Sequence, residues 1–135
     1  MTGALDLVEA LGAAEDASVE RLTLYIPSQD RHGAPFDSSP WIDEALRLLS
    51  AIGGGATAMP PADGAWLNLE TNALIIEKVV LVYSFIDPDR FEAEVPMLRQ
   101  FLHRLGRETD QGEVVCELEG QLFKIRNYDD GDDDG

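Results

Sequence analysis

The chain has 135 residues, of which 44% are hydrophobic and 7% aromatic, and this is enough for one domain with a real core. A net charge of −16 repels phosphate backbones, so we expect no direct nucleic-acid binding and favour a basic protein partner or simple solubility. No apolar stretch approaches the roughly 18 residues that span a bilayer, and the N-terminus lacks the basic segment of a signal peptide. We therefore expect a cytoplasmic protein that does not bind a membrane. A single cysteine excludes an intramolecular disulfide.

The negative charge is concentrated at the two ends of the chain. The first twenty residues carry −5, and the Asp-rich segment 129–134 carries another −5. We expect residues 1–20 to form an acidic arm or a short helix, and residues 127–135 to form a disordered acidic tail. The tail lacks the ligand spacing of a calcium loop, so we expect no metal site there.

A strand, a polar loop and a helix follow the arm. Residues 22–26 alternate in the manner of a half-buried strand, and residues 28–39 form a polar loop. Ser39 and Pro40 are typical of a helix start, because a serine side chain caps free N–H groups and proline tolerates the first helical position. Apolar residues at helical spacing predict a helix over 40–52, which a run of three glycines ends.

The second half of the chain repeats this pattern around its longest apolar run. Residues 74–86 are apolar on both faces of a strand, and they follow a strand over 56–59 and 65–69 that the turn PPADG interrupts. A second helix over 88–105 contains Pro96, which should kink the helix or split off its first turn.

The last core strand covers residues 113–118, and residues 121–125 extend it after Gly120. The order is strand, helix, strand, strand, helix, strand. It predicts an α+β domain over residues 21–126 with the ferredoxin-like βαββαβ arrangement. We expect a four-stranded antiparallel sheet with both helices on one face.

Several short segments carry a family resemblance over residues 21–126. They are LTLY at 22–25, the helix start at Trp41, GAW at 64–66, LIIE at 74–77 and HRLGRE at 103–108. These segments resemble a small bacterial family catalogued only as a domain of unknown function. The resemblance implies the ferredoxin-like fold and no activity.

Four side chains form the candidate catalytic set. Asp30 and His32 lie in the polar loop just past the first strand, and an acid beside a histidine can tune a general base near Tyr25. Glu77 lies within the apolar strand, so its carboxylate must be paired, exposed at an edge or raised in pKa. A solvated loop is the alternative for the first pair, and a structural ion pair or a subunit contact is the alternative for Glu77.

The apolar strand needs cover on two faces, whereas the chain offers two convincing helices. We expect Leu74, Ile76, Val80 and Val82 to meet the helices and the other face of the strand to remain open. An open apolar face of this kind indicates a partner surface. Its expected interface residues are Tyr25, Trp66, Val79, Leu81 and Tyr83.

A basic cluster on the second helix contains Arg99, His103, Arg104 and Arg107. It could receive an anionic ligand, an acidic partner or the acidic tail of the same chain, and a solvated helix face is the alternative. Two histidines and one cysteine are too few for a zinc site, and no cofactor is expected.

These features support three hypotheses of different classes. The first is a non-enzymatic interaction module that binds a second copy or another protein, such as a toxin or a nucleic-acid enzyme that it restrains. The second is a small cofactor-free enzyme of the isomerase or oxygenase type, with a cleft at a dimer interface. The third is an anion or nucleotide sensor that uses the basic cluster.

Overall fold

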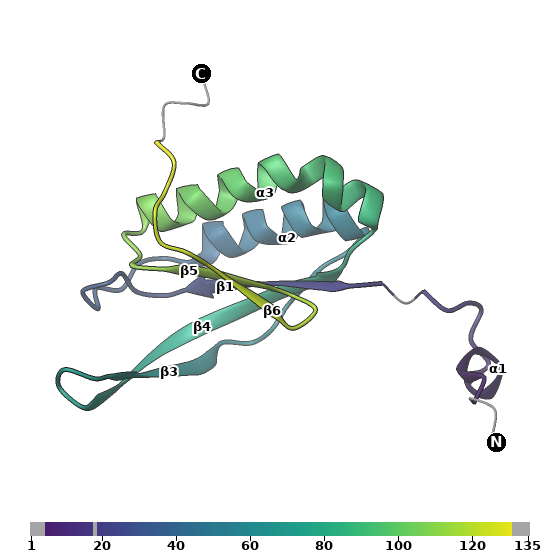
Figure 1. Ribbon diagram of the computed structural model, residues 1–135, viewed down its shortest axis with the longest axis horizontal. Coiled ribbons are helices and arrows are strands. Elements are labelled where there is room, and N and C mark those ends of the chain that lie inside the picture. The colour runs from purple at the N-terminus through teal and green to yellow at the C-terminus, as the bar shows by residue number, and fades with distance from the viewer. Residues whose placement is uncertain (1–4, 18, 131–135) are drawn as a thin grey trace.

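The computed structural model describes residues 5–17 and 19–130, which form helices and one antiparallel sheet (Figure 1). The sheet order is β2-β4-β1-β5-β6, and β3 also pairs with β4. The helices of the described residues are α1 (Leu7–Leu11), α2 (Ser39–Gly53) and α3 (Pro88–Glu108). The strands are β1 (Arg21–Pro27), β2 (Thr57–Ala58), β3 (Ala62–Asn68), β4 (Ala73–Phe85), β5 (Val114–Leu118) and β6 (Gln121–Ile125).

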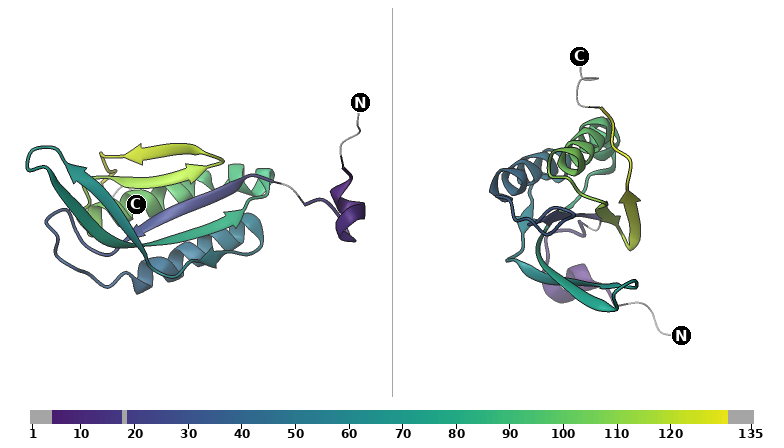
Figure 2. Two further views of the ribbon diagram at one scale, coloured as in Figure 1. Left: turned by 90° about the horizontal axis from the view of Figure 1, so that it is seen from below. Right: turned by 90° about the vertical axis from the view of Figure 1, so that its left-hand side faces the viewer.

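Helices α2 and α3 lie side by side on one face of the sheet, and no described helix covers the other face (Figures 1 and 2). The core fills the space between the helices and the sheet. Its sheet side is formed mainly by alternate residues of the two central strands, Leu22, Leu24, Ile26, Val80 and Val82, and β5 adds Val114 and Cys116. Because successive side chains of a strand point to opposite faces, the residues between these lie on the open face.

The predicted four-stranded ferredoxin-like sheet is wrong, because the structure has six strands in one antiparallel sheet. Two turns account for the difference. Pro60 and Pro61 have no N–H group for a sheet ladder, so the chain beside β4 is divided into β2 and β3. Glu119 and Gly120 both have positive φ angles, 47° and 85°, which suit a two-residue hairpin turn. The chain therefore reverses there, and β6 pairs with β5 instead of extending it.

The two main helices begin near their predicted positions but with different capping. Ser39 is the first residue of α2, and its backbone N–H donates to the Asp37 carboxylate at 3.0 Å. The Asp87 carboxylate accepts two N–H groups of the first turn of α3, as an N-cap does. Helix α3 continues through Pro96 as one helix, so its first turn is not split off.

The hairpin of β3 and β4 extends beyond the two helices (Figure 2). Val80 and Val82 meet the helices as predicted, whereas Leu74 and Ile76 are 61% and 57% exposed at the far end of β4. On the opposite face of the hairpin, Trp66 is 54% exposed. The hairpin therefore presents apolar side chains on both faces.

The two ends of the chain differ in their contact with the domain. Helix α1 buries none of its residues and stands apart from the sheet (Figures 1 and 2). The segment after β6 instead runs back toward α3, where the Tyr128 ring lies against Gly106. Residues 131–135 of the predicted acidic tail lie outside the described residues.

Candidate functional site

Glu77 lies on the open face, where β4 meets the segment that follows β1. The residue opposite it in β3 is Gly64, which has no side chain to pack over the carboxylate. Ser28 and Gln29 donate backbone hydrogen bonds to the carboxylate, but Oε2 is buried and has no hydrogen-bond partner among the described residues. A buried acceptor without a partner costs free energy, and this exception singles out Glu77 as a candidate functional group.

Burial raises the pKa of the Glu77 carboxyl above its ordinary value, and the two backbone hydrogen bonds oppose that rise only in part. No charged side chain of the described residues contributes to the shift. The adjacent Lys78 is on the opposite face of β4, where its Nζ lies 2.6 Å from Asp63. Glu77 is therefore a carboxylate that lacks a cationic partner among the described residues.

A second polar pair lies further along the open face. The Tyr25 hydroxyl donates to Glu117 Oε1 at 3.0 Å, because β1 and β5 pair with Thr23 opposite Glu117. Burial, followed by the contact with Glu117, raises the pKa of the Tyr25 hydroxyl. Tyr25 is therefore protonated at neutral pH and acts as a hydrogen-bond donor.

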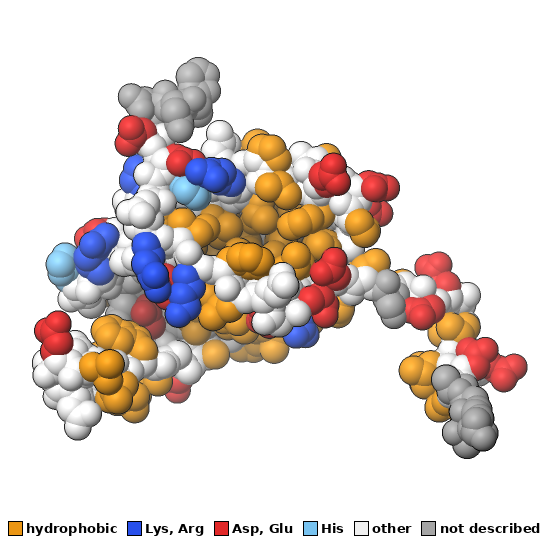
Figure 3. Space-filling view, viewed as in Figure 1, with side chains coloured by type: hydrophobic (Ala, Val, Ile, Leu, Met, Phe, Trp, Pro, Cys, Tyr) orange, Lys and Arg blue, Asp and Glu red, His pale blue; other side chains and the backbone are white. Residues whose placement is uncertain are grey.

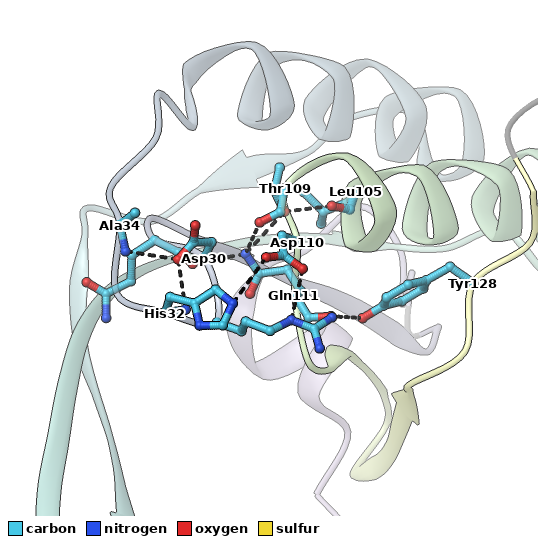
Figure 4. A network of polar contacts seen from close by, with 10 residues as sticks. Asp30, His32, Ala34, Leu105, Thr109, Asp110, Gln111 and Tyr128 are labelled. Carbon is cyan, nitrogen blue, oxygen red and sulfur yellow. Dashed lines mark hydrogen bonds and ion pairs between the residues drawn. The ribbon is translucent and has the colours of Figure 1, made fainter.

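Asp30 and His32 are directed into their own loop and toward the end of α3 (Figure 4). The Asp30 carboxylate accepts the N–H groups of His32 and Ala34 at 2.8 and 2.9 Å. The bond from Ala34 first, and then that from His32, lowers the pKa of Asp30. The His32 Nε2 atom lies 3.7 Å from Asp110 Oδ2. Both side chains therefore shape a loop, and neither contacts Glu77.

The loop after β1 is bound to the turn that follows α3 (Figure 4). The Arg31 Nε atom lies 2.9 Å from Asp110 Oδ1, and the Arg31 backbone N–H donates to the Asp110 carbonyl at 2.9 Å. The Gln111 side chain donates to the Gln29 carbonyl at 2.9 Å. Gln29 in turn contacts Glu77, so the turn and the carboxylate are connected through a single residue.

The candidate catalytic set therefore does not form one constellation. Tyr25 is opposite Leu81 in the sheet, and Glu77 lies four residues further along β4, at about 13 Å for an extended strand. Tyr25 and Glu77 share the open face, whereas Asp30 and His32 are in the adjoining loop. Of the four, Glu77 has the environment of a functional carboxylate.

The five predicted interface residues all lie on the open face, as the register of β1, β3 and β4 requires. Trp66 is exposed, and the other four are half-buried. Figure 3 shows hydrophobic side chains on the projecting hairpin and a second group over α3, β5 and β6. The exposed large apolar residues of α3 include Val95 and Met97, and those of β6 are Leu122 and Phe123.

The basic cluster is engaged by acidic groups of the same chain. Asp129 accepts two hydrogen bonds from Arg99, at 2.8 and 3.1 Å, and Arg107 donates to its backbone carbonyl at 2.6 Å. His103 is 7% exposed, and its Nδ1 accepts the Asp129 N–H at 2.8 Å. Arg104 pairs with Glu44 of α2. Arg99 and Arg104 are paired with carboxylates of the same chain, and the other two side chains are bonded to the Asp129 backbone, so an anion sensor at this cluster is not supported.

Within residues 5–17 and 19–130, no group of three or more His, Cys, Asp or Glu side chains is placed to hold a metal ion. No helix in this part of the chain has both the length and the apolar content needed to cross a membrane.

Sequence reasoning missed two residues that matter to this face, Glu117 and Gln111. The alternation of the last core strand could have placed Glu117 on the open face beside Tyr25. Gln111 lies in a turn, and no pattern in the sequence indicates a role for it. Its role depends on a contact with Gln29 across 82 positions of the chain.

No protein-family model matches the sequence, and no curated protein matches it significantly. The resemblance to a domain of unknown function therefore stays a prediction. Two solved structures share the fold. One is a phage SAM lyase in complex with S-methyl-5'-thioadenosine, with a TM-score of 0.58 and 12% identity over 84% of this chain and 95% of the other. The second is a phage SAM lyase in the apo state, with a TM-score of 0.55 and 13% identity over 84% and 94%.

These neighbours correct the functional hypotheses drawn from the sequence. The first hypothesis, a non-enzymatic interaction module, is contradicted by the two solved structures with this fold, because both are described as a SAM lyase, which is an enzyme. The sheet to which that module was assigned, ferredoxin-like with four strands, is also not the one observed.

Proposed function

We propose that this chain is an enzyme that binds S-adenosylmethionine on its open sheet face and cleaves a carbon–sulfur bond of that substrate. The observation that carries the proposal is the Glu77 carboxylate, which is half-buried, raised in pKa and without a partner for Oε2 among the described residues. The fold shared with a phage SAM lyase that holds S-methyl-5'-thioadenosine supports the choice of substrate.

The charge of the substrate suits this position. S-adenosylmethionine carries a positive sulfonium centre, and a buried carboxylate attracts a cation more strongly than a solvated one does. Binding would place a positive charge beside Glu77, lower the pKa of its carboxyl and offset the cost of burying it. A neutral thioether offers no such gain, so the site favours the substrate over S-methyl-5'-thioadenosine.

Trp66 supplies an aromatic surface next to the carboxylate. It is two residues from Gly64 on the same face of β3, which makes it a diagonal neighbour of Glu77. The residue is 54% exposed, so its side chain is available to a ligand. An indole face attracts cations and stacks on purine rings, and both groups occur in S-adenosylmethionine.

The proposed reaction breaks the bond between sulfur and the aminobutyrate carbon. The bonding electron pair moves to sulfur, which becomes the neutral thioether of S-methyl-5'-thioadenosine. The departing carbon either accepts the substrate's own carboxylate oxygen and forms a lactone, or the neighbouring carbon loses a proton to a base and an alkene forms. In the first route Glu77 binds the sulfonium and positions the substrate for attack by its own carboxylate, and in the second route it takes the proton.

The decisive experiment incubates the purified chain with S-adenosylmethionine and follows S-methyl-5'-thioadenosine by chromatography and mass spectrometry. We expect the wild-type chain to release it and Glu77→Gln to lower kcat/KM by about 10²- to 10⁴-fold. The second product, lactone or alkene, identifies the role of Glu77.

Glu70→Gln is the matched control, because Glu70 is exposed at the tip of the same hairpin. It should retain wild-type activity. A wild-type chain that neither binds nor consumes S-adenosylmethionine would contradict the proposal, as would full activity in Glu77→Gln.

Binding can be measured separately from turnover. The chain has two tryptophans, so Trp41→Phe leaves Trp66 as the only indole fluorophore. Titration with S-adenosylmethionine should quench the emission of this variant. In Trp66→Phe the remaining Trp41, which packs against Phe101 between the helices, should not respond.

We also propose that the chain is cytoplasmic, where S-adenosylmethionine is made and used, and that it forms a homodimer through the hairpin of β3 and β4. The hairpin exposes apolar residues on both faces, and monomers seldom leave such a surface open. Light scattering should give twice the chain mass. Ile76→Asp should reduce it to the chain mass, whereas Leu122→Asp on β6 should not. A wild-type monomer would contradict the dimer.

A further inference from the structure

We infer that Gln111 is a positioning residue for the proposed site, because it fixes the backbone segment that supplies the N–H groups bound to Glu77. The inference rests on the proposed function for its catalytic consequence. The structural link, from the turn after α3 to the carboxylate, is independent of that function.

Gln111 is 7% exposed, and both its side chain and its backbone carbonyl are engaged (Figure 4). Its side-chain Nε2 donates to the Gln29 carbonyl at 2.9 Å and contacts Thr109 Oγ1 at 3.1 Å. Its backbone carbonyl accepts the Tyr128 hydroxyl at 2.8 Å and the Arg31 guanidinium at 3.1 Å. A buried glutamine with this many partners holds the backbone that it contacts in one place.

The segment that Gln111 holds is the one that contacts Glu77. Ser28 and Gln29 donate their backbone N–H groups to the Glu77 carboxylate. The Ser28 hydroxyl donates to the Lys78 carbonyl at 2.6 Å, so the same segment is also bound to β4. The Gln29 carbonyl accepts a hydrogen bond from the Gln111 side-chain amide, and the Gln29 N–H donates to Glu77. The bond to Gln111 therefore helps to fix the position of the N–H that Glu77 accepts.

The backbone hydrogen bonds lower the pKa of Glu77 against the effect of burial. Without the Gln111 amide, the Gln29 carbonyl loses its contact with the turn after α3, while the contacts of Arg31 with that turn remain. The Gln29 peptide is then held less firmly, and its bond to Glu77 lengthens. The Glu77 carboxyl then keeps the rise caused by burial and loses the opposing contribution. We expect its pKa to increase further, because burial then acts with less opposition.

The test replaces Gln111 with Met, which has a similar length and no polar atoms that bond as an amide does. The titration of the Glu77 side-chain carboxyl is followed by carbon NMR, and the pH profile of kcat/KM for S-adenosylmethionine is measured alongside it. In Gln111→Met, both the NMR pKa and the acidic limb of the profile should move upward by the same amount. Gln100→Met, on the exposed face of α3, should leave both unchanged.

Thr109→Val provides a second variant in case Gln111→Met does not fold. It removes the hydroxyl that orients the Gln111 amide and leaves the glutamine in place. We expect a smaller shift in the same direction. An unchanged Glu77 pKa in folded Gln111→Met would overturn the inference. If Gln111→Met does not fold, an unchanged Glu77 pKa in Thr109→Val would do so. A loss of activity without a change in this pKa would mean that the role of Gln111 is merely structural. A wild-type chain that does not cleave S-adenosylmethionine refutes the proposed function instead, and the NMR titration still decides the role of Gln111.

Discussion

Glu77 combines a cost to folding with the role proposed for it in function. Its folded-state pKa lies above the ordinary value, chiefly because of burial. Such an acid contributes stability below its unfolded pKa and loses that contribution as the pH rises through the folded pKa. At neutral pH the ionised carboxylate therefore destabilises the free protein relative to a neutral side chain.

Thermal unfolding of the wild-type chain and Glu77→Gln should reveal this cost. We expect the melting temperature of Glu77→Gln, relative to that of the wild type, to increase by roughly 2 to 4 °C between pH 4 and pH 7. The quantity compared is the difference in melting temperature between the variant and the wild type at each pH, so any effect of the glutamine side chain that does not depend on pH cancels. A difference that stays flat or falls over this range would contradict the raised pKa.

The residue types in the sequence were enough to single out part of the candidate site. A carboxylate within an apolar strand was unusual enough to single out Glu77 from the sequence, and its environment agrees with the raised pKa considered for it. His32 and Asp30 gave the same signal, an acid beside a base, although their partners are Asp110 and the loop backbone. Composition cannot distinguish these cases, because the distinction depends on which elements meet in space.

At the scale of elements, the packing of α2 on β4 depends on one glycine. A Cβ at Gly53 would lie 2.1 Å from Ser84 Oγ and 2.5 Å from the Phe85 carbonyl oxygen. The carbonyl belongs to a central strand and cannot move aside. We expect Gly53→Ala to destabilise the protein by about 2 to 3 kcal/mol, as measured by urea denaturation.

Gly55 is the matched control in the same glycine run. A Cβ added there would have no atom within 4 Å, and the φ of Gly55 is not in the left-handed region. Gly55→Ala should change stability by less than about 0.5 kcal/mol. If the two substitutions lower the free energy of unfolding equally, the close contact between Gly53 and β4 does not determine the stability.

The contact between the C-terminal segment and α3 can be tested by a double-mutant cycle. A Cβ at Gly106 would lie 2.2 Å from the Tyr128 ring, so Gly106→Ala must displace that ring and destabilise the protein. With Tyr128→Ala as background, the clash is absent, and alanine should stabilise the helix by up to about 1 kcal/mol. Urea denaturation of the four proteins should therefore show that Gly106→Ala lowers the free energy of unfolding in the wild-type background and raises it in the Tyr128→Ala background. The same sign in both backgrounds would contradict this packing.

The spacing of apolar residues predicted most helices and strands, but not the strand ends that determine how many strands the sheet has. The apolar positions of α2, α3 and β4 follow their helical and strand spacings, so these elements were predictable. The strand count was not, because Pro60 and Pro61 divide an edge strand and Glu119 with Gly120 reverses the chain. Whether a turn interrupts a strand or begins a new one depends on pairing with distant residues.

At the scale of the whole molecule, the charge of −16 should guide a cationic substrate toward the chain. We expect KM for S-adenosylmethionine to rise several-fold between 50 mM and 500 mM salt, since salt screens such attraction. The affinity for uncharged S-methyl-5'-thioadenosine, measured by titration calorimetry, should stay nearly constant over the same range. An equal salt dependence of the two ligands would indicate that net charge has no part in recognition.

The paired prolines between β2 and β3 also affect the behaviour of the chain at high concentration. An uninterrupted strand over residues 57–68 would offer a long row of free N–H and carbonyl groups to the edge strands of other molecules, the arrangement from which amyloid fibrils grow. Pro60 and Pro61 remove two donors from that row and end the ladder where β2 stops. The same two residues that divide the sheet thereby protect a strongly apolar hairpin from aggregation.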